Sequence, residues 1–257
     1  MSTAEFLVSP ALAGLPHGFF TRRGGVSQGG FASLNCALSG ADDPGDVAEN
    51  RALAMQAIGL EPASLVGLHQ VHGAAVVTLR GPLTTGDRPK ADGMVTDRPG
   101  LALGIITADC GPVLFADAEA GVVGACHAGW RGAVAGVCEA VLDAMERIGA
   151  RRERVTAVLG PCIRQLSYEV GDDLRDAVLP SLEEAEAFFA PGHRPAHWQF
   201  DMAGYIAARL ERAGTGLVRV IEADTCADEA RFFSYRRRTL RGEGPIGHQL
   251  SAIALPR

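Results

Sequence analysis

The sequence lacks the features that mark several large classes of protein. No run of about 18 apolar residues occurs, so no transmembrane helix is predicted. The first twenty residues have no basic leader followed by an unbroken apolar stretch, so we expect no signal peptide and a cytoplasmic protein. The net charge is -6, and neither half of the chain is strongly basic. Neither nucleic acid nor a membrane is therefore expected as the main partner, because binding phosphate backbones requires concentrated positive charge.

Missing motifs also limit the choice of cofactor. The chain has no Walker A loop and no GxGxxG between a strand and a helix, so nucleotide cofactors of the usual kind are not indicated. The deaminase signature H-x-E…P-C-x-x-C is absent. None of the six cysteines forms a CxxC pair, and a chain of this length does not depend on a disulfide framework. We therefore expect reduced thiols, most of them in the core.

The composition that remains suits a globular protein with a substantial core. The 257 residues are 47% hydrophobic and 21% charged. No repeat, low-complexity region or linker divides them, so we expect a single domain over residues 1–257. Strand patterns joined by hairpins and broken by a few helices replace the regular βαβα alternation of doubly wound sheets. The sequence therefore predicts a mixed α+β fold.

The clearest secondary-structure patterns lie in the middle of the chain. Residues 101–107 are typical of a strand buried on both faces, and two strands follow at 113–115 and 122–125, joined by a hairpin. Apolar residues at helical spacing predict one helix over 134–148, ended by Gly149. Further predictions are a helix from Asp46 to Gly59, a strand pair within 64–79, a loop over 80–90, strands at 155–159, 217–221 and 248–255, a loop at 191–197, and helices from 172 and over 202–213.

Cys110 and His127 are the residues most suggestive of chemistry. They stand on either side of the predicted hairpin, which can bring them together. In one interpretation, His127 is a base that activates the Cys110 thiolate as a nucleophile. In the other, both are metal ligands, and a third ligand such as His72 comes from another strand. One cysteine and two histidines with an open fourth position are typical of catalytic zinc.

The residues next to this pair are interpreted one by one. Asp109 is a candidate general acid or base, or a structural hydrogen-bonding group. Cys126 should face the opposite side of the strand from His127 and belong to the core. Residues 129–132, GWRG, lie at a strand-to-helix junction, where free N–H groups and Arg131 predict a phosphate or carboxylate site. Alternatively, the glycines allow close packing of the helix on the sheet.

The remaining polar residues give weaker indications. Residues 17–35 are a glycine-rich polar segment that contains RRGG at 22–25, and they form either an anion site with its arginines or a hairpin, which is the simpler interpretation. His69 and His72 are three positions apart, so on a strand only one would face a given site. The basic run 236–238 is typical of a solvated face. Spacing does not decide whether Tyr168 and Tyr235 line a pocket or belong to the core. We expect His193 and His197 in an exposed loop. No nearby residues form a recognisable motif with His17 or His248.

Several motifs together resemble one known family. They are FTRRGGVSQGGFASLN, LHQVHG, ADGMVTDRPGLALGIITADCGPV, HAGWRGAVAGV, LGPCI with YEVG, and RFFSYRR, and they extend from about residue 17 to the C-terminus. This set is similar to the YfiH/laccase-domain family. That family has also been called polyphenol oxidase, multifunctional purine nucleoside phosphorylase and peptidoglycan editing factor.

The resemblance implies a fold, a metal and a set of substrates. The implied fold is α+β, with a central β-sandwich of mixed sheets flanked by outer helices, as in cytotoxic necrotizing factor. The implied metal is zinc, held by His72, Cys110 and His127, with copper as a possible substitute. The implied substrates are purine nucleosides and phosphate, through phosphorolysis of adenosine, inosine and methylthioadenosine, together with adenosine deamination. Arg22 and Arg131 are the implied anion contacts.

The sequence departs from the family pattern in two segments, and it is compatible with other functions. The chain has NCALSGADDP where the family often has NLGLHVGDDP, and a TGRQ-like C-terminal segment is altered at 241–244, with Gln249 further on. An alternative function is a Cys/His amide hydrolase that edits peptidoglycan precursors. Copper-dependent polyphenol oxidation is less favoured, because the seven histidines include no HxH pair. A non-enzymatic role would leave the Cys–His–His set without a purpose.

Overall fold

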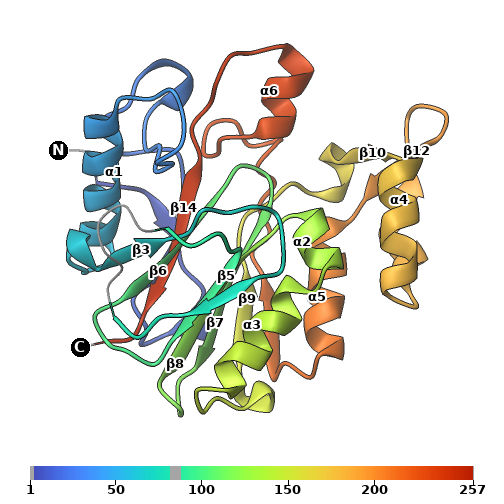
Figure 1. The fold of residues 1–257 in the computed structure, drawn as a ribbon. Coiled ribbons are helices and arrows are strands. Elements are labelled where there is room, and N and C mark those ends of the chain that lie inside the picture. Colours follow the sequence, from blue (N-terminus) through green and yellow to red (C-terminus); the bar gives the residue numbers. More distant parts are fainter. Residues whose placement is uncertain (1–2, 82–87, 257) are drawn as a thin grey trace.

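Two mixed β-sheets pack face to face in the centre of the protein, as a computed structural model describes it for residues 3–81 and 88–256 (Figure 1). The six-stranded sheet has the order β13-β9-β7-β8-β5-β4, and the five-stranded sheet has the order β1-β2-β14-β6-β3. Most neighbours are antiparallel, but β4 with β5, β13 with β9 and β3 with β6 are parallel. The strands of the larger sheet are β4 (Val76–Thr78), β5 (Gly93–Thr96), β7 (Gly111–Asp117), β8 (Val122–Ala128), β9 (Thr156–Leu159) and β13 (Leu217–Val220). Those of the smaller are β1 (Phe6–Leu7), β2 (His17–Phe20), β3 (Leu65–Gly67), β6 (Ala102–Thr107) and β14 (Gln249–Ala254).

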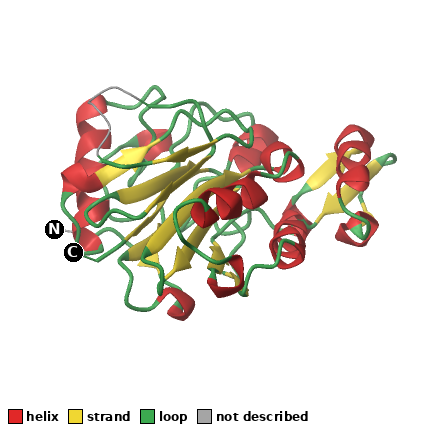
Figure 2. Ribbon diagram, turned by 60° about the horizontal axis from the view of Figure 1, so that its bottom comes forward, coloured by secondary structure: helices red, strands yellow, loops and turns green. Residues whose placement is uncertain are grey.

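Helices cover the outer faces of both sheets (Figure 2). On the five-stranded sheet lies α1 (Pro44–Ala57), and on the six-stranded sheet lie α2 (Trp130–Val134), α3 (Val137–Glu146) and α5 (Met202–Arg212). A small third sheet stands to one side with α4 (Asp172–Val178), and consists of β10 (Glu169–Gly171), β12 (His197–Phe200) and β11 (Phe189–Pro191). The last helix is α6 (Tyr235–Arg241). Short 3₁₀ turns occur at Pro10–Leu12, Gly29–Phe31, Pro62–Ser64, Arg152–Arg154, Gln165–Ser167, Leu179–Ser181 and Ala185–Phe188.

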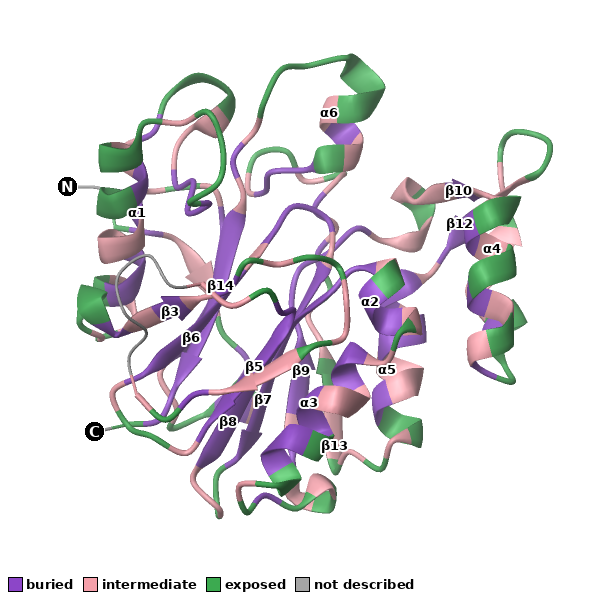
Figure 3. Ribbon diagram, in the orientation of Figure 1, coloured by how far each residue is buried: buried purple, intermediate pink, exposed green. Residues whose placement is uncertain are grey.

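The core follows from the alternation of side chains along the buried strands. In β7, Leu114 and Ala116 face the space between the sheets, while Val113 and Phe115 face the helices. Both faces of the strand are therefore buried, as Figure 3 shows for the centre of the molecule. This arrangement confirms the expected α+β fold with a sandwich of mixed sheets and outer helices. Within the described residues, no helix combines the length and apolar character needed to cross a membrane.

Three predicted elements differ from those in the structure. The helix expected over 134–148 is broken at Gly136, whose φ of 87° interrupts the helical path, into α2 and α3. The N-cap of α1 is Asp43 instead of Asp46, because the Asp43 carboxylate accepts the N–H groups of Gly45 and Asp46. The expected strand pair of residues 64–79 does not form, since β3 and β4 belong to different sheets.

Other differences lie at the edges of the fold. Residues 21–35 form an irregular loop after β2 instead of a hairpin, and α6 was not predicted at all. The loop expected over 80–90 lies largely at 82–87, outside the described residues. All six cysteines are free thiols, as expected.

A glycine just after β9 allows the two sheets to approach closely. A Cβ at Gly160 would lie 2.1 Å from Cδ1 and 2.4 Å from Cε1 of the buried Phe19 ring. We expect Gly160→Ala to lower the free energy of unfolding by about 1–3 kcal/mol, because a packed core cannot yield to an extra methyl group. Urea denaturation measures the change. Gly40→Ala is the control: it is exposed, has no atom within 4 Å of its Cβ position, and should change stability by less than about 0.5 kcal/mol. Equal stabilities for the two variants would contradict the prediction.

Candidate metal centre and its cavity

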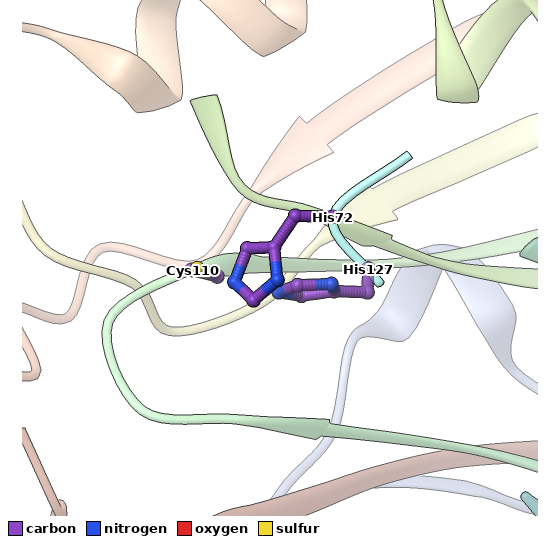
Figure 4. Close-up of side chains that lie close together, drawn as sticks. All are labelled: His72, Cys110 and His127. Carbon is purple, nitrogen blue, oxygen red and sulfur yellow. The ribbon is translucent and has the colours of Figure 1, made fainter. Parts of the chain in front are cut away.

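Three segments that are distant in the sequence bring His72, Cys110 and His127 together. His72 lies in the loop between β3 and β4, Cys110 immediately precedes β7, and His127 lies in β8. Their ligand atoms all lie within 4.8 Å of one another (Figure 4). The β7–β8 register pairs Gly111 with Ala128, which brings Cys110 beside the end of β8. The structure thus places the three predicted ligands around one point.

Strand geometry decides which neighbouring residue points into this site. His127 shares its face of β8 with Val123 and Ala125, whose side chains lie between the sheets. Cys126 faces the helices, where its sulfur lies 3.9 Å from that of Cys138. The placement of Cys126 in the core is as expected.

A buried aspartate that the sequence analysis missed orients two of the three residues. The Asp92 carboxylate lies 2.8 Å from Nδ1 of His127 and accepts the backbone N–H groups of Val71, His72 and Gly73 at 2.8–3.1 Å. These bonds hold the His72 loop, in which His72 itself has a φ of 60°. The available indication was a charged residue next to a buried apolar strand, since a buried carboxylate must be paired.

The electrostatics of the site favour a deprotonated Cys110. Burial raises the pKa of the thiol, but the nearby charge of His127 and hydrogen bonds from His127 and His72 outweigh it and lower the pKa to about 6. Burial lowers the pKa of His127, but the Cys110 thiolate and the Asp92 carboxylate raise it to about 9. Burial would raise the pKa of Asp92, but hydrogen bonds from His127 and the loop N–H groups lower it below its usual range. A thiolate is what both a nucleophile and a metal ligand require.

The donor set also fits a single metal ion. Two imidazole nitrogens and one thiolate suit zinc or copper. Because Nδ1 of His127 is bonded to Asp92, its Nε2 remains for a metal, as in carboxylate–histidine–metal arrangements. Gly129 allows the approach: a Cβ there would lie 3.0 Å from the Cys110 sulfur and 3.3 Å from the His72 ring.

The three residues line a cavity of about 890 Å³, which lies within the size range of small-molecule sites. Tyr168 and Tyr235 are both among its lining residues, as are His69 and His248. Of His69 and His72, which both line the cavity, only His72 belongs to the cluster with Cys110 and His127, and His69 forms a β-bridge with Lys90. Leu38, Tyr235 and Leu240 are large hydrophobic residues that are more than half exposed, and they contribute an apolar part of the lining.

The two arginines proposed as anion contacts differ in position. Arg131 is exposed, lines the cavity and lies over the Trp130 ring at 4.3 Å. Arg22 is not among the lining residues: its guanidinium donates to the carbonyl groups of Ala32 and Glu229 and lies 4.5 Å from the Phe233 ring centroid. These contacts connect the loop that contains Ala32 to the loop that contains Glu229. The helix α2 begins within GWRG, at Trp130, and has only five residues, so it contributes little dipole.

Asp109 connects the Cys110 turn to α6. Its carboxylate accepts hydrogen bonds from the hydroxyl groups of Thr225 and Ser234 and from the backbone N–H of Arg236, at 2.6–2.9 Å. Burial raises its pKa despite these bonds. Because both oxygens are engaged, the contacts favour the structural alternative for Asp109.

The basic run 236–238 is not the solvated face that its composition indicates. Arg237 is buried, and its guanidinium donates to the carbonyl groups of Thr225, Cys226 and Phe232. Arg236 lines the cavity and donates to the carbonyl of Glu169. Irregular chain around α6 leaves carbonyl groups without partners, and guanidinium groups can satisfy several of them at once.

Among the remaining histidines, His193 is exposed as expected, but His197 begins β12 instead of lying in a loop. His17 bonds locally, with the Ser9 backbone N–H donating to its Nε2.

Comparisons with known proteins agree on a family. A family model described as multi-copper polyphenol oxidoreductase laccase matches residues 16–256. A Deinococcus radiodurans protein named purine nucleoside phosphorylase is 42% identical over 257 residues, which cover 98% of this chain and 93% of that protein. A Streptomyces coelicolor protein with the same name is 40% identical over 232 residues, which cover 89% of this chain and 93% of that protein.

Solved structures share the fold over the full chain. The crystal structure of a Neisseria meningitidis protein has a TM-score of 0.88 at 35% identity and covers 99% of this chain and all of that one. The crystal structure of YlmD from Geobacillus stearothermophilus has a TM-score of 0.89 at 30% identity and covers 100% of both chains.

Proposed function

The chain belongs to the multi-copper polyphenol oxidoreductase laccase family, and from this premise we propose that it is a zinc-dependent purine nucleoside enzyme. Its reactions would be phosphorolysis of adenosine, inosine and methylthioadenosine, together with adenosine deamination. The observation that carries the proposal is the His72–Cys110–His127 cluster in the wall of a cavity of small-molecule size. Relatives at 40–42% identity that are named purine nucleoside phosphorylase support the substrate class.

Zinc is the metal we favour for this cluster. Two histidines, one cysteine and an open fourth position are the usual ligands of catalytic zinc, although copper binds such sites tightly as well. Within the described residues, the cluster is the single group of three such ligands, whereas multi-copper chemistry needs several. When bound, zinc would supply a Lewis acid that stabilises negative charge developing on the substrate.

The protein's own groups supply positioning. Phosphorolysis replaces the bond between ribose C1′ and the base nitrogen with a bond to a phosphate oxygen, so nucleoside and phosphate must be held together. Arg131, at the cavity wall, is the phosphate contact we propose; Arg22 is not, because its guanidinium is engaged outside the cavity. Asp92 fixes the ring orientation of His127 and the position of the His72 loop.

A Cys/His amide hydrolase is the second candidate function. The pKa values of about 6 for Cys110 and about 9 for His127 describe a thiolate–imidazolium pair, which is a competent nucleophile without a metal. Metal dependence separates the two candidates.

The test is product analysis with and without phosphate. We expect adenine from adenosine only when phosphate is present, inosine from deamination, and about one zinc ion per chain. Removing the metal with a chelator should lower both activities by about a hundredfold or more, and added zinc should restore them, because several kcal/mol of charge stabilisation are lost. Full activity of the metal-free protein together with inactivation by iodoacetamide would reject the zinc requirement and leave Cys110 as a nucleophile. Neither product from the zinc-loaded protein would reject the proposal.

A further inference from the structure

The cavity beside the metal cluster has an excess of positively charged side chains. Arg88, Arg131 and Arg236 line it, and Asp109 is the single carboxylate among the lining residues that the structure describes. Both oxygens of Asp109 already accept hydrogen bonds within the protein. Guanidinium groups that outnumber carboxylates in the wall of a cavity favour an anionic ligand.

Two of these arginines have no carboxylate partner within residues 3–81 and 88–256. The Arg131 guanidinium lies 4.3 Å from the ring of the neighbouring tryptophan, and Arg236 donates from Nη1 to the carbonyl of Glu169. Arg209, which is partly buried like Arg236, pairs instead with Glu139 at 2.6 Å. A partly buried guanidinium without a counter-ion is costly, so Arg236 is available to an anion from outside the chain.

The donors that remain unpaired are accessible to a ligand. Arg131 is exposed. Nε and Nη2 of Arg236 and the hydroxyl of Tyr168 have no hydrogen-bond partner among the described residues, and none of these atoms is fully buried. Because all three residues line the cavity, a molecule in it can contact these donors.

Tyr168 connects the two arginines to the metal cluster. The guanidinium carbon of Arg236 lies 5.2 Å from the centroid of the Tyr168 ring. Burial raises the pKa of Tyr168, and the charges that then act most on its hydroxyl are those of Cys110, Arg236, Asp109 and Arg131. All four of these residues line the cavity. The hydroxyl therefore lies near both arginines and near Cys110.

The chemistry of these groups selects phosphate as the ligand. Two guanidinium groups and a phenolic hydroxyl present hydrogen-bond donors, and guanidinium groups match the oxygens of a phosphate dianion in charge and geometry. A neutral nucleoside offers no charge for them to bind. Their position near Cys110 places the anion beside the cluster, where phosphate must approach ribose C1′.

We propose that Arg131, Tyr168 and Arg236 together form the subsite that binds the attacking phosphate. This inference rests on the proposed purine nucleoside activity and adds two residues to the phosphate contact at Arg131. An oxygen of the bound phosphate forms the new bond to ribose C1′, and the bond from C1′ to the base nitrogen breaks. The electron pair of that bond leaves with the base, which also receives the proton of hydrogen phosphate.

The test measures the binding of inorganic phosphate to the zinc-loaded protein by calorimetry. We expect Arg236→Gln to raise the Kd for phosphate by about 10- to 100-fold, because charge-assisted hydrogen bonds are lost. Arg236→Lys keeps the charge but not the planar fork, and Tyr168→Phe removes one neutral donor, so each should raise it by about 3- to 10-fold.

Kinetics on adenosine give a second readout. The KM for phosphate should rise in the order of the Kd values. The ratio of phosphorolysis to deamination should fall in the same variants, because deamination uses water and not phosphate.

A matched control separates phosphate contact from charge and folding. Arg238→Gln makes the same change of charge in the same helix, α6, but Arg238 does not line the cavity and donates to the carbonyl groups of Glu243 and Gly244. It should keep the phosphate Kd within about twofold, because a distant exposed charge is screened. Tyr168→Phe should keep the urea midpoint, since its hydroxyl has no partner among the described residues.

Phosphate can also reach the cavity as part of a nucleotide, so adenosine 5′-monophosphate is titrated alongside inorganic phosphate. Binding of the nucleotide that the variants weaken, without binding of inorganic phosphate, would overturn the proposal and assign the arginines to a phosphoryl group of the substrate. Equal phosphate Kd and KM values in the wild type, Arg236→Gln and Tyr168→Phe would overturn it as well and place phosphate elsewhere. Phosphate binding that the variants weaken, with no reaction of any nucleoside, would reject the proposed function and leave only an anion site.

Discussion

Replacing Cys110 with alanine should lower adenosine phosphorolysis by about a thousandfold or more and remove the metal from the purified protein. The substitution deletes the single thiolate of the cluster, and two histidines alone bind zinc weakly. Several kcal/mol of charge stabilisation disappear with the ion, and each 1.36 kcal/mol corresponds to about a tenfold change in rate. Initial rates and metal analysis on the same preparation measure both effects.

Cys126→Ala is the matched control for this experiment. Cys126 adjoins His127 in the sequence but faces the helices, so its removal leaves the cluster intact. We expect a loss of about 1 kcal/mol in stability from the small cavity, with metal content and rate retained. Full metal and activity in Cys110→Ala would refute the proposed ligand set. Loss of activity with full metal content would favour Cys110 as a nucleophile.

Replacing Asp92 with asparagine should weaken zinc binding by about a hundredfold and lower the free energy of unfolding by about 3 kcal/mol. Asp92 is fully buried, bonds to the His127 ring and accepts three N–H groups of the His72 loop. An amide has one acceptor oxygen where the carboxylate has two, so it cannot serve the ring and the loop together. Competition with a chromophoric chelator measures the affinity, and urea denaturation of the metal-free protein measures the stability.

Asp117→Asn is the corresponding control, because Asp117 is an equally buried carboxylate that contacts none of the cluster residues. It accepts the N–H groups of Ala120 and Arg151 and pairs with Arg154. Burial would raise its pKa, but these hydrogen bonds lower it below the usual range. The ionised Asp117 carboxylate therefore stabilises the folded protein at pH values above the ordinary carboxyl pKa, and this stabilisation is lost as the pH falls through the pKa of Asp117 in the folded protein.

We expect Asp117→Asn to be destabilised near neutral pH, to lose less stability than the wild type on acidification, and to bind zinc normally. An equal loss of zinc affinity in Asp92→Asn and Asp117→Asn would show that general destabilisation, and not orientation of the ligands, explains the Asp92 effect.

Residue pattern was sufficient for the central strands and for the pairing of Cys110 with His127. The buried run before Cys110, the β7–β8 hairpin and the two-face alternation that separates His127 from Cys126 all depend on local periodicity. His72 was one candidate for the third ligand from residue type, and the resemblance of LHQVHG to the family selected it, because its approach to Cys110 depends on two loops and the order of the strands.

The errors share a physical cause. Asp92, Arg22 and Arg237 each act through backbone groups that are distant in the sequence, and local composition contains no record of such partners. The break at Gly136 and the absence of a hairpin after β2 likewise follow from how neighbouring segments pack.

The sequence by itself therefore determined the α+β class, the buried strands and the Cys110–His127 pair, since these depend on side-chain alternation and on a short connection. Tertiary structure alone decided that Asp92 orients the site and that Arg131, and not Arg22, lines the cavity. The reason is that hydrogen-bond satisfaction in a buried site is a property of the assembled chain, to which segments more than a hundred residues apart contribute their donors and acceptors together.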